Sequence, residues 1–441
     1  MNTTPSPAGT LSALAMARYG AMALPLAFAG LPVYLHAPDF YATDLGVSLT
    51  ALGLILLVLR LIDAVQDPLI GSWSDRWSNH RPAILTVGAL MLAGGFWMVF
   101  TPLVSAPLTW FASAVLLCTT GFSVVSINLQ ALGGLWHATD ADRTRIAGWR
   151  EGLGLLGLLL AAMAPTLLGA GQDRASAFGW LAVLYLPLIA LGLWLLLSWL
   201  RQAALDHPLG DQPALRWRDL VSSPWRKRFF GLYLLNTIAG SIPAVLVMFF
   251  IRDRIGAEDL TGLFLLAYFL SGAASMAVWP KVAARIGKAR AWALSMALAI
   301  ATFIWAALLG SGDIAAYTIV CVLSGLALGA DLALPAAILA DHIVRTKAQE
   351  AASRLYSIMT FVSKAALALA TGLVLPVLGL LGYVPGTLPD TTTATLLSIA
   401  YAALPCALKL VTLIWLLRCL STLDHATASN LAPARERHEN I

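Results

Sequence analysis

The sequence predicts an all-α polytopic membrane protein with twelve transmembrane helices arranged as two six-helix halves. The first observation is the composition, because 59% of the 441 residues are hydrophobic and only 12% are charged, whereas soluble domains carry about a quarter charged residues. The second is the recurrence of apolar stretches, each long enough to cross a hydrocarbon layer about 30 Å thick. The third is their division into six and six around a basic segment, 202–228.

The twelve predicted spans follow one another with short connections. The second, fourth, tenth and eleventh are longer than a bilayer requires, which indicates tilt or extension beyond the membrane. The predicted organisation is an N-terminal half over 1–201, a cytoplasmic linker over 202–228, a C-terminal half over 229–420 and a cytoplasmic tail over 421–441. The spans are 12–36, 44–74, 82–104, 107–136, 144–170, 177–200, 228–251, 258–284, 289–311, 314–343, 350–381 and 392–418.

Loop charges predict the orientation in the membrane. Basic residues concentrate in alternate loops, and the positive-inside rule places those loops in the cytoplasm. Both termini are then cytoplasmic, and we expect the protein in a bacterial inner membrane. The basic residues in these loops are Arg76, Arg81, Arg143, Arg145, Arg216, Arg218, Arg226, Lys227, Arg228, Arg285, Lys288, Arg290, Arg345 and Lys347.

Several classes of function are disfavoured. Nucleic-acid binding requires a basic face on a soluble module, and the spans leave no room for one. The four cysteines stand singly and the seven histidines are scattered, so we predict no metal cluster and no cofactor. A membrane enzyme lacks support, because the chain has no nucleophile elbow or phosphate loop. The polar start of the chain lacks the pattern of a signal peptide, so we expect the first span to be retained.

Charged residues within the second span are the main functional signal. Arg60, Asp63 and Asp67 lie within about 60° of one another on a helix, at 100° per residue. Two carboxylates one turn apart repel each other, and a bound cation or a proton relieves this repulsion. The pattern therefore predicts a site for Na⁺ or H⁺ at Asp63 and Asp67. A simple Arg60–Asp63 ion pair is the structural alternative, but it leaves Asp67 unexplained.

Other ionic groups fall deep within spans, where each requires a partner or water. They are Arg150 in span five, Asp331 in span ten and Lys364 in span eleven. We expect Lys364 to pair with Asp63 or Asp67 across the two halves, and Asp331 to project into the central cavity; static ion pairs are the alternative. For Lys409 we expect snorkelling toward the cytoplasmic end of span twelve. Gly325 and Gly329 have a spacing typical of close helix packing.

These motifs resemble those of the glycoside–pentoside–hexuronide:cation symporters, the melibiose-permease-like members of the major facilitator superfamily. The resemblance covers nearly the whole chain in the right order, which is more specific than any single motif. Its strongest element is RLIDAVQDPLIGSWSDR at 60–76, followed by Arg81-Pro82. The other matching stretches are YATDLGVS (41–48), INLQALGGLWHATDADRTRIAGWR (127–150), GADLALPAAILAD (329–341) and YSIMTFVSK…GLLGYVPG (356–386).

The resemblance implies the superfamily fold, alternating access and roles for particular residues. Asp63, Asp67, Gln66 and Ser123 would form the cation site. Arg60, Lys364, Arg150 and Asp331 would form a coupling network of charges. A latch that holds the outward-facing state would contain Gly71, Asp75, Arg76 and Arg81.

The sequence also departs from the family at the sugar site. The first sugar-binding acid falls on Ala27, the second on Ser126 or Asn128, and a neighbouring tryptophan becomes Gln130. The cation machinery is thus retained while the solute pocket is rebuilt. Candidates to line the new pocket are Ser126, Asn128, Gln130, Arg150, Asn236 and Asp331.

The sequence therefore predicts a monomeric, Na⁺- or H⁺-coupled carrier of a small solute such as a sugar, glycoside or related organic molecule. Its expected partners are the solute, the coupling cation and the lipid bilayer, with no nucleic acid. Two alternatives remain: a carrier of lysolipids or other amphiphiles, and proton-driven drug efflux with Asp331 as the proton carrier. Neither the solute nor the coupling ion follows from the sequence.

Overall fold

The computed structural model describes residues 11–103, 105–169, 173–206, 216–383 and 391–423. Within these ranges the chain forms helices joined by short connections, with one isolated backbone bridge between Trp136 and Leu205. Most of the predicted tail and residues 207–215 of the predicted linker lie outside the described ranges. The described part of the linker contains α9 (Trp217–Ser222) and the start of α10 at Pro224.

The elements follow the predicted spans within a few residues, apart from the first span, which is extended to Thr43. The N-terminal half contains α1 (Ala13–Gly20), α2 (Ala23–Leu31), η1 (Pro32–His36), α3 (Ala37–Thr43), α4 (Leu49–Arg76), η2 (Ser78–His80), α5 (Arg81–Phe100), α6 (Pro107–Leu135), α7 (Asp140–Leu167) and α8 (Arg174–Leu200).

The C-terminal half begins after α9. It contains α10 (Pro224–Phe249), η3 (Phe250–Ile255), η4 (Glu258–Leu260), α11 (Thr261–Ser275), α12 (Trp279–Ile286), α13 (Lys288–Phe303), η5 (Ile304–Leu308), α14 (Ile314–Arg345), η6 (Gln349–Ala351), α15 (Ala352–Leu380), α16 (Thr391–Ser398), η7 (Ile399–Ala403) and α17 (Leu404–Leu423).

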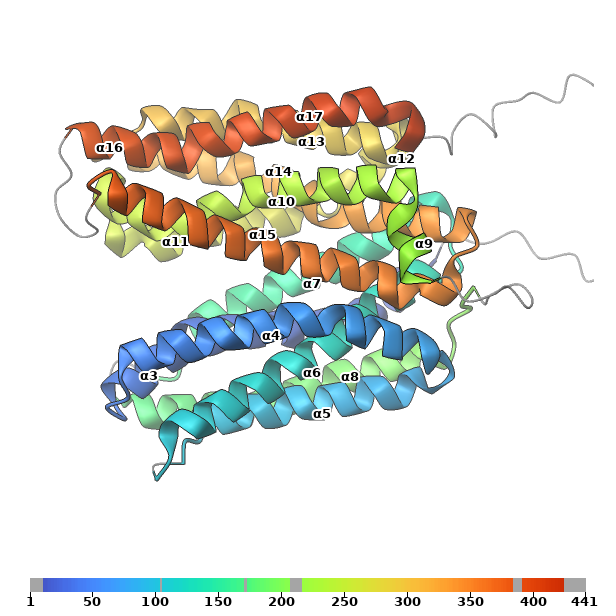
Figure 1. Cartoon of the computed structure of the whole chain (residues 1–441), viewed down its shortest axis with the longest axis horizontal. Helices are drawn as coiled ribbons and strands as arrows, with labels where there is room; N and C mark the ends of the chain where they lie inside the picture. The colour runs from blue at the N-terminus through green and yellow to red at the C-terminus, as the bar shows by residue number, and fades with distance from the viewer. Residues whose placement is uncertain (1–10, 104, 170–172, 207–215, 384–390, 424–441) are drawn as a thin grey trace, which may run out of the picture.

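Ten helical segments in the described ranges are long and apolar enough to span a membrane, or eleven when the bent pair Glu258–Ser275 and Trp279–Ile286 is counted as one. α4 is not among them, although its 28 residues extend over about 42 Å and it runs alongside the others in Figure 1. It carries five charged side chains. The predicted number of twelve is reached only when both α4 and the bent pair are counted.

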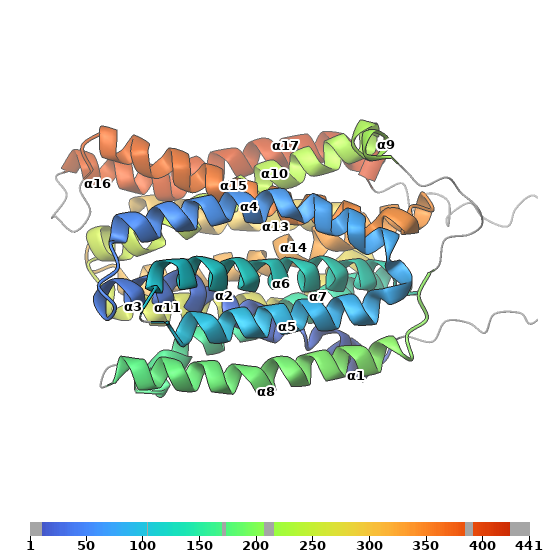
Figure 2. The same cartoon turned by 60° about the horizontal axis from the view of Figure 1, so that its bottom comes forward.

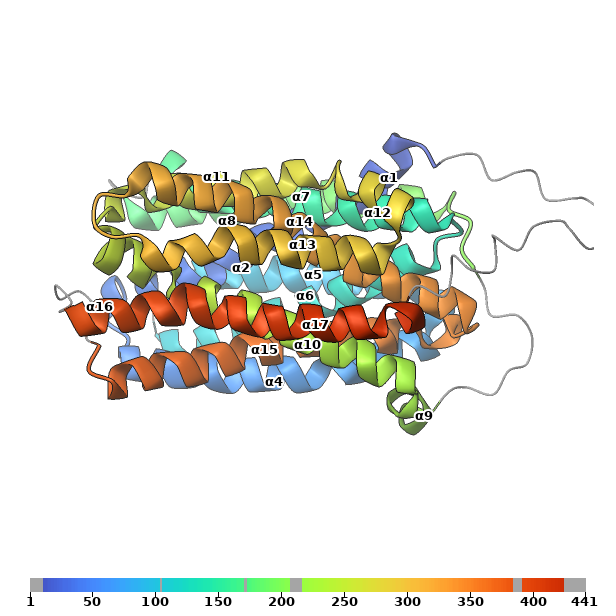
Figure 3. The same cartoon turned by 90° about the horizontal axis from the view of Figure 1, so that it is seen from above.

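The two halves are packed together at one end of the bundle, which we call the basic end because it carries the loops rich in arginine and lysine. Figure 1 shows α4 and α15 converging toward this end, near α9, and diverging toward α3 and α16. The turned view in Figure 2 shows the helices of both halves running along one common direction. In Figure 3 the start of α1 and the end of α17 both lie at the basic end. The described chain thus begins and ends on one side of the bundle.

The hydrophobic cores agree with this arrangement. One buried cluster is built from the N-terminal half alone, and a second, around Phe250 and Tyr401, is built from the C-terminal half alone. A third cluster joins the halves, because it combines Ala131 and Ala147 with Tyr356 and its neighbours in the C-terminal half. Apolar packing between the halves is therefore concentrated toward the basic end, so that end is closed.

Within the C-terminal half, α11 and α14 approach closely over small residues. A Cβ atom added at Gly325 would overlap the carbonyl oxygen of Tyr268, and one added at Gly329 would lie 3.0 Å from the carbonyl oxygen of Gly272. The spacing of these two glycines predicted such packing, which depends on backbones approaching without side chains between them.

We expect Gly325→Ala to lower the melting temperature of the purified protein, because the new methyl group must push α14 away from α11 at a cost of about 1–3 kcal/mol. Gly240→Ala on α10 is the matched control, because a Cβ atom there meets open space and alanine favours the helix. Thermal unfolding in detergent measures both variants. Equal melting temperatures for the two would contradict the packing role.

Candidate functional site

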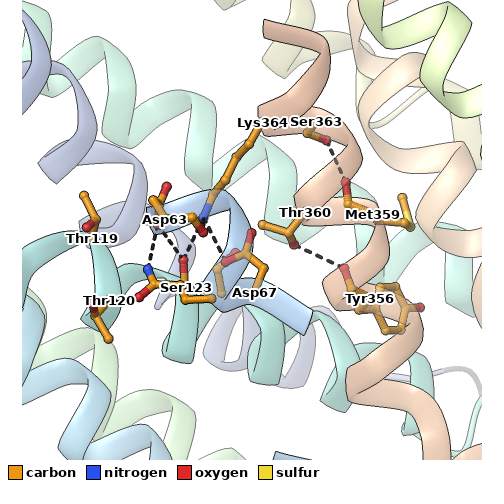
Figure 4. Close-up of polar contacts among 12 residues, drawn as sticks. Asp63, Asp67, Thr119, Thr120, Ser123, Tyr356, Met359, Thr360, Ser363 and Lys364 are labelled. Atoms are coloured by element: carbon orange, nitrogen blue, oxygen red, sulfur yellow. Dashed lines mark hydrogen bonds and ion pairs between the residues drawn. The ribbon is translucent and has the colours of Figure 1, made fainter. Parts of the chain in front are cut away.

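Four side chains from three helices meet between the halves, and we call them the central charge cluster: Asp63 and Asp67 of α4, Ser123 of α6 and Lys364 of α15. The Lys364 Nζ atom lies 2.8 Å from Asp63 Oδ1 and 2.9 Å from Asp67 Oδ1. It also donates to Ser123 Oγ at 2.8 Å. Figure 4 shows the ammonium group of Lys364 between the two carboxylates. The predicted pairing across the halves is present, with both acids rather than one.

One carboxylate oxygen atom of the central charge cluster has no hydrogen-bond partner among the described residues. Asp63 Oδ1 also accepts hydrogen bonds from Gln66 Nε2 at 2.9 Å and from Ser123 Oγ at 3.2 Å. Asp67 is fully buried, and its Oδ2 atom has no hydrogen-bond partner among the described residues. Gln66 is held in turn by Thr120, which donates to its Oε1 atom at 3.0 Å. The lysine therefore leaves one buried carboxylate oxygen unsatisfied.

The antiparallel pairing of α4 with α15 explains why these residues meet. Gly71 lies against Ser357, and a Cβ atom at Gly71 would be only 2.5 Å from the Ser357 hydroxyl oxygen. Asp67 lies one turn before Gly71 on α4, and Lys364 lies seven residues after Ser357 on α15. Because the two helices are antiparallel, the side chain of Lys364 contacts Asp67. Pro68 adds a local effect, because it has no N–H to donate to the carbonyl group of Ala64. That carbonyl oxygen becomes available next to Asp63.

Arg60 does not pair with Asp63. Its guanidinium group lies over the ring of Tyr34, 5.2 Å from the ring centroid, and the residue is exposed. Among the described residues, no carboxylate lies within 4 Å of it. The self-neutralising Arg60–Asp63 pair considered above is therefore not formed in this structure.

A second ionic group lies on α7. Arg150 is buried and donates from Nε and Nη2 to Glu151 Oε1, at 3.0 and 2.5 Å. Its helix α7 packs against α11 and α14 of the opposite half. The predicted residue Arg150 thus lies on a helix at the interface of the halves, with Glu151 as a carboxylate partner that the sequence did not indicate.

Asp331, which is half-buried, and Lys409, which is buried, form an ion pair within the C-terminal half. Lys409 Nζ lies 2.5 Å from Asp331 Oδ2, and Trp292 Nε1 donates to Asp331 Oδ1 at 3.1 Å. The expected snorkelling of Lys409 is wrong, because the residue lies halfway along the span Thr392–Leu423, where a carboxylate partner is closer than the interface. Asp331 is held by α13 and α17 and does not contact the central charge cluster.

The other pocket candidates are divided between two environments. Asn128 is fully buried against α4, where its Nδ2 atom donates to Ser74 Oγ at 2.9 Å. Gln130 faces the other half, donating to Ser126 Oγ at 3.2 Å and approaching Thr360 Oγ1 at 3.5 Å. Asn236 of α10 is buried, and its Oδ1 atom has no partner among the described residues. Ser126 and Gln130 therefore fit a polar surface between the halves, whereas Asn128 fits an internal contact.

Three of the four latch candidates lie where α4 meets the start of α15. Asp75 accepts hydrogen bonds from the backbone N–H groups of Ser353 and Arg354, at 2.8 and 3.0 Å, and forms an ion pair with the Arg354 side chain. Arg81 lies 3.9 Å from Asp75 and donates to Ser353 Oγ. An acid at a helix N-terminus is stabilised by the free N–H groups and by the helix dipole. Together with Gly71, these residues tie the halves together; Arg76 is exposed at the end of α4.

A second contact between the halves involves Asp341 of α14. It lies 3.1 Å from Arg143 of α7 and 2.5 Å from Lys288 of α13. One carboxylate therefore bridges both halves at the basic end. A separate cavity of about 430 Å³ lies at the basic end of the N-terminal half, lined in part by Arg18, Trp136 and Trp199, and it contains no member of the central charge cluster.

The sequence reading missed several residues of these sites. Glu151 follows Arg150 directly, and Asp341 closes the quoted stretch at 329–341, so both could have been found by position. Thr120 and Arg354 gave no comparable signal, because their roles depend on how helices from distant parts of the chain pack.

We expect Asp75→Ala to open the basic end, because it removes the acceptor of two helix N-terminal amides and one arginine. The measurement is the alkylation rate of Ser357→Cys in a chain whose four native cysteines are replaced by serine. We expect a several-fold faster rate in Asp75→Ala. Asp173→Ala, at the exposed start of α8, is the control and should leave the rate unchanged; an unchanged rate in Asp75→Ala itself would argue against a latch.

Comparison with known proteins shows which family this chain belongs to. The model of the MFS/sugar transport protein family matches residues 16–421. Similar curated proteins are the inner membrane symporter YicJ and the putative glycoside/cation symporter YagG, both of Escherichia coli K12, with 25% and 29% identity. The match covers 54% of this chain and 53% of YicJ, and 34% of this chain and 35% of YagG. The uncharacterized symporter YjmB of Bacillus subtilis 168 is 24% identical over 78% of each chain.

Solved structures share the fold. A bacterial homologue of the iron transporter ferroportin, in an outward-facing state, superposes with a TM-score of 0.70 at 15% identity, over 92% of this chain and 98% of that one. The Escherichia coli fucose:proton symporter FucP gives a TM-score of 0.63 at 15% identity, over 92% and 97%. With its two halves, its paired acids in the second span and its match along the whole bundle, this chain belongs to the MFS/sugar transport protein family, a family of membrane transporters and not of enzymes.

Proposed function

We propose that the protein is a cation-coupled symporter of a small organic solute, that it works by alternating access in the bacterial inner membrane, and that the central charge cluster binds the coupling cation. One observation carries the proposal: Lys364 is a single positive charge between two buried carboxylates. The cluster therefore has a net charge of −1, and one Na⁺ or one proton neutralises it.

The donor set suits either ion. Na⁺ is a hard cation that prefers oxygen ligands, and the unsatisfied Asp67 Oδ2 atom, Asp63 and Ser123 supply them. Among the described residues, no group of three His, Cys, Asp or Glu side chains could hold a metal ion, so the cluster resembles a monovalent-cation site rather than a transition-metal site. A proton on Asp67 would satisfy the same oxygen atom.

Coupling follows from the position of Lys364. The lysine belongs to the C-terminal half and the acids to the N-terminal half, so the cation and the lysine compete for the same oxygen atoms. Cation binding would loosen this tie between the halves, while the Asp75 and Asp341 contacts hold the basic end closed. If the cation and the solute favour the same occluded state, each raises the affinity for the other by the same factor. The symporter names of similar proteins support this reading.

We expect Asp63→Asn to abolish cation-driven uptake and the rise in melting temperature on adding Na⁺ or lowering pH, because the neutral cluster no longer requires a cation. A ligand at 100 times its dissociation constant stabilises the folded state by about 2.7 kcal/mol, which a thermal scan detects easily. Asp219→Asn, on the exposed surface of α9, is the control. Normal cation stabilisation in Asp63→Asn would remove the proposed site.

Lys364→Gln tests the competition between lysine and cation. Removing the ammonium group leaves two carboxylates with no counter-charge, so we expect the midpoint of Na⁺ or proton stabilisation to shift by about tenfold toward tighter binding, or about 1.4 kcal/mol. Cation-driven solute accumulation should be lost in the same variant. A midpoint equal to that of the wild type would show that the lysine and the cation do not share a site.

A further inference from the structure

The cavity of about 430 Å³ at the basic end of the N-terminal half takes no part in the proposed transport cycle. It is lined by the start of α1, by the turn between α6 and α7, and by the end of α8 with the residues that follow it. None of these residues belongs to the C-terminal half, so the cavity lies away from the interface between the halves. Its volume is in the range of sites that bind small molecules.

The cavity lies at the level where the bundle leaves the membrane. Four candidate spans in the described ranges reach the basic end beside it. Ala13–Thr43 and Asp140–Pro165 begin there, and Pro107–Leu135 and Arg174–Leu200 end there. The ends of spans lie at the boundary between hydrocarbon and water, where tryptophan is enriched, and two tryptophans line this cavity. A ligand in the cavity would therefore lie at the level of the lipid headgroups.

Arg18 is a charged group in this cavity that has no counter-charge. It lies in the last turn of α1 and is half-buried. Within the described part of the chain, its side chain makes neither an ion pair nor a hydrogen bond. A guanidinium group is always protonated and its N–H groups need acceptors, and burying such a group without an acceptor is unfavourable. Arg18 therefore favours an anion in the cavity.

The other charged side chains that line the cavity are already paired. Asp142 is buried and accepts a hydrogen bond from Arg145 at 2.7 Å. His137 lies 2.7 Å from Asp206, which does not line the cavity. The positive charge of Arg18 is therefore not compensated by the acid beside it.

The wall of the cavity is largely aromatic and apolar. Trp136 and Trp199 are buried, with their ring centroids 4.7 Å apart in an edge-to-face arrangement, and Ala15 and Ala203 add small side chains. The Nε1 atom of Trp199 has no hydrogen-bond partner among the described residues, so the wall also contains an unused donor. An unpaired arginine with such a wall suits a ligand that has an anionic group and an apolar part.

The outer surface next to the cavity is apolar as well. α1 packs against α8, and Figure 2 shows the two helices side by side toward the basic end. Leu14 of α1 and Leu191 and Trp194 of α8 are exposed on this part of the bundle. Exposed apolar side chains of this kind on a span face acyl chains in a bilayer. A lipid with its headgroup in the cavity would have an apolar surface for its acyl chains, whereas a soluble anion would not use this surface.

We propose that the cavity binds the phosphate group of an anionic phospholipid, and that Arg18 holds this phosphate. A guanidinium group forms charge-assisted, two-pronged hydrogen bonds with phosphate oxygens. The loop charges predict that the basic end faces the cytoplasm, and the cytoplasmic leaflet is the one that carries anionic lipids. The ten residues before Leu11 contain no Asp or Glu, so that neighbouring segment has no acidic side chain to offer Arg18.

The lipid would contact α1, the start of α7 and the end of α8 together, and it would thereby stabilise the N-terminal half. This role depends on neither the coupling ion nor the solute. A ligand that binds only the folded state raises the melting temperature in proportion to its occupancy of the site, so lipid binding can be measured by thermal unfolding.

The test compares headgroups of different charge. Full-length protein in detergent is titrated with dioleoylphosphatidylglycerol, with zwitterionic dioleoylphosphatidylcholine, and with glycerol 3-phosphate and inorganic phosphate as soluble arms. The titrations are made in about 0.5 M KCl, which screens exposed charges. We expect phosphatidylglycerol to raise the melting temperature with an affinity about fivefold or more above that of phosphatidylcholine. The soluble phosphates should have no effect at the same concentrations.

Arg18→Gln should weaken the binding of phosphatidylglycerol by about tenfold. It should not lower the melting temperature without lipid, because Arg18 has no protein partner to lose. Ala203→Trp keeps every charge but fills the cavity, so it should weaken lipid binding in the same way, and it serves if Arg18→Gln does not fold. Arg285→Gln, exposed at the end of α12 in the other half, is the control and should bind the lipid as the wild type does.

Four results would overturn the inference. The first is equal affinity of the wild type for the two lipids, and the second is unchanged lipid affinity in Arg18→Gln and Ala203→Trp. The third is stabilisation by a soluble phosphate that is lost in Arg18→Gln, which would make the ligand a soluble anion. The fourth is a lower melting temperature of lipid-free Arg18→Gln with its lipid affinity intact, which would give Arg18 an internal structural role.

Discussion

Two carboxylates one turn apart in the middle of a membrane protein need positive charge, and here that charge comes from the opposite half of the molecule. Lys364 of α15 reaches both Asp63 and Asp67 of α4 and also Ser123 of α6. The contact joins the halves near the middle of α4 and α15. In the proposed mechanism this contact is weakened when a cation binds to the acids. The same interaction can therefore both hold the halves together and respond to the coupling ion. The rest of the interface is arranged around this adjustable contact.

Toward the basic end, the interface has a different character. Gly71 brings α4 against Ser357, Asp75 caps the start of α15, and Asp341 bridges Arg143 and Lys288. These contacts combine close packing with satisfied hydrogen bonds, and the apolar cluster around Tyr356 adds to them. In the other direction from Lys364, α4 and α15 diverge toward α3 and α16 (Figure 1), and Arg60 of α4 is exposed. We interpret this arrangement as one state of the proposed alternating-access cycle, in which the basic end is closed.

Much of the fold and of the central charge cluster could be predicted from the sequence. The length of each apolar stretch indicates a membrane span, and the helical periodicity of its polar residues indicates which of them share a face. The two acids of α4 lie on one face of the helix, and few basic residues lie deep enough in other spans to pair with them. The pairing with Lys364 could therefore be predicted. The ion pair between Lys409 and Asp331 was not predicted, because the distance of Lys409 from the end of its span does not reveal that Asp331 lies on a neighbouring helix. Asn128 likewise looked available to a solute, but it is buried against Ser74. Such outcomes depend on which helices become neighbours, and one sequence does not contain that information in readable form. The coupling ion, the solute and the roles of the central side chains remain predictions.

The charge on α4 has a consequence for how the protein is made. This helix carries Arg60, Asp63, Asp67, Asp75 and Arg76, and it is not among the segments apolar enough to cross a membrane by composition. Its neutralising lysine is synthesised 297 residues after Asp67. We therefore expect α4 to enter the bilayer together with apolar neighbours such as α5 and α6, and its acids to lack their lysine partner until α15 has been made. The charge balance of the first half is accordingly completed only when the second half has been made.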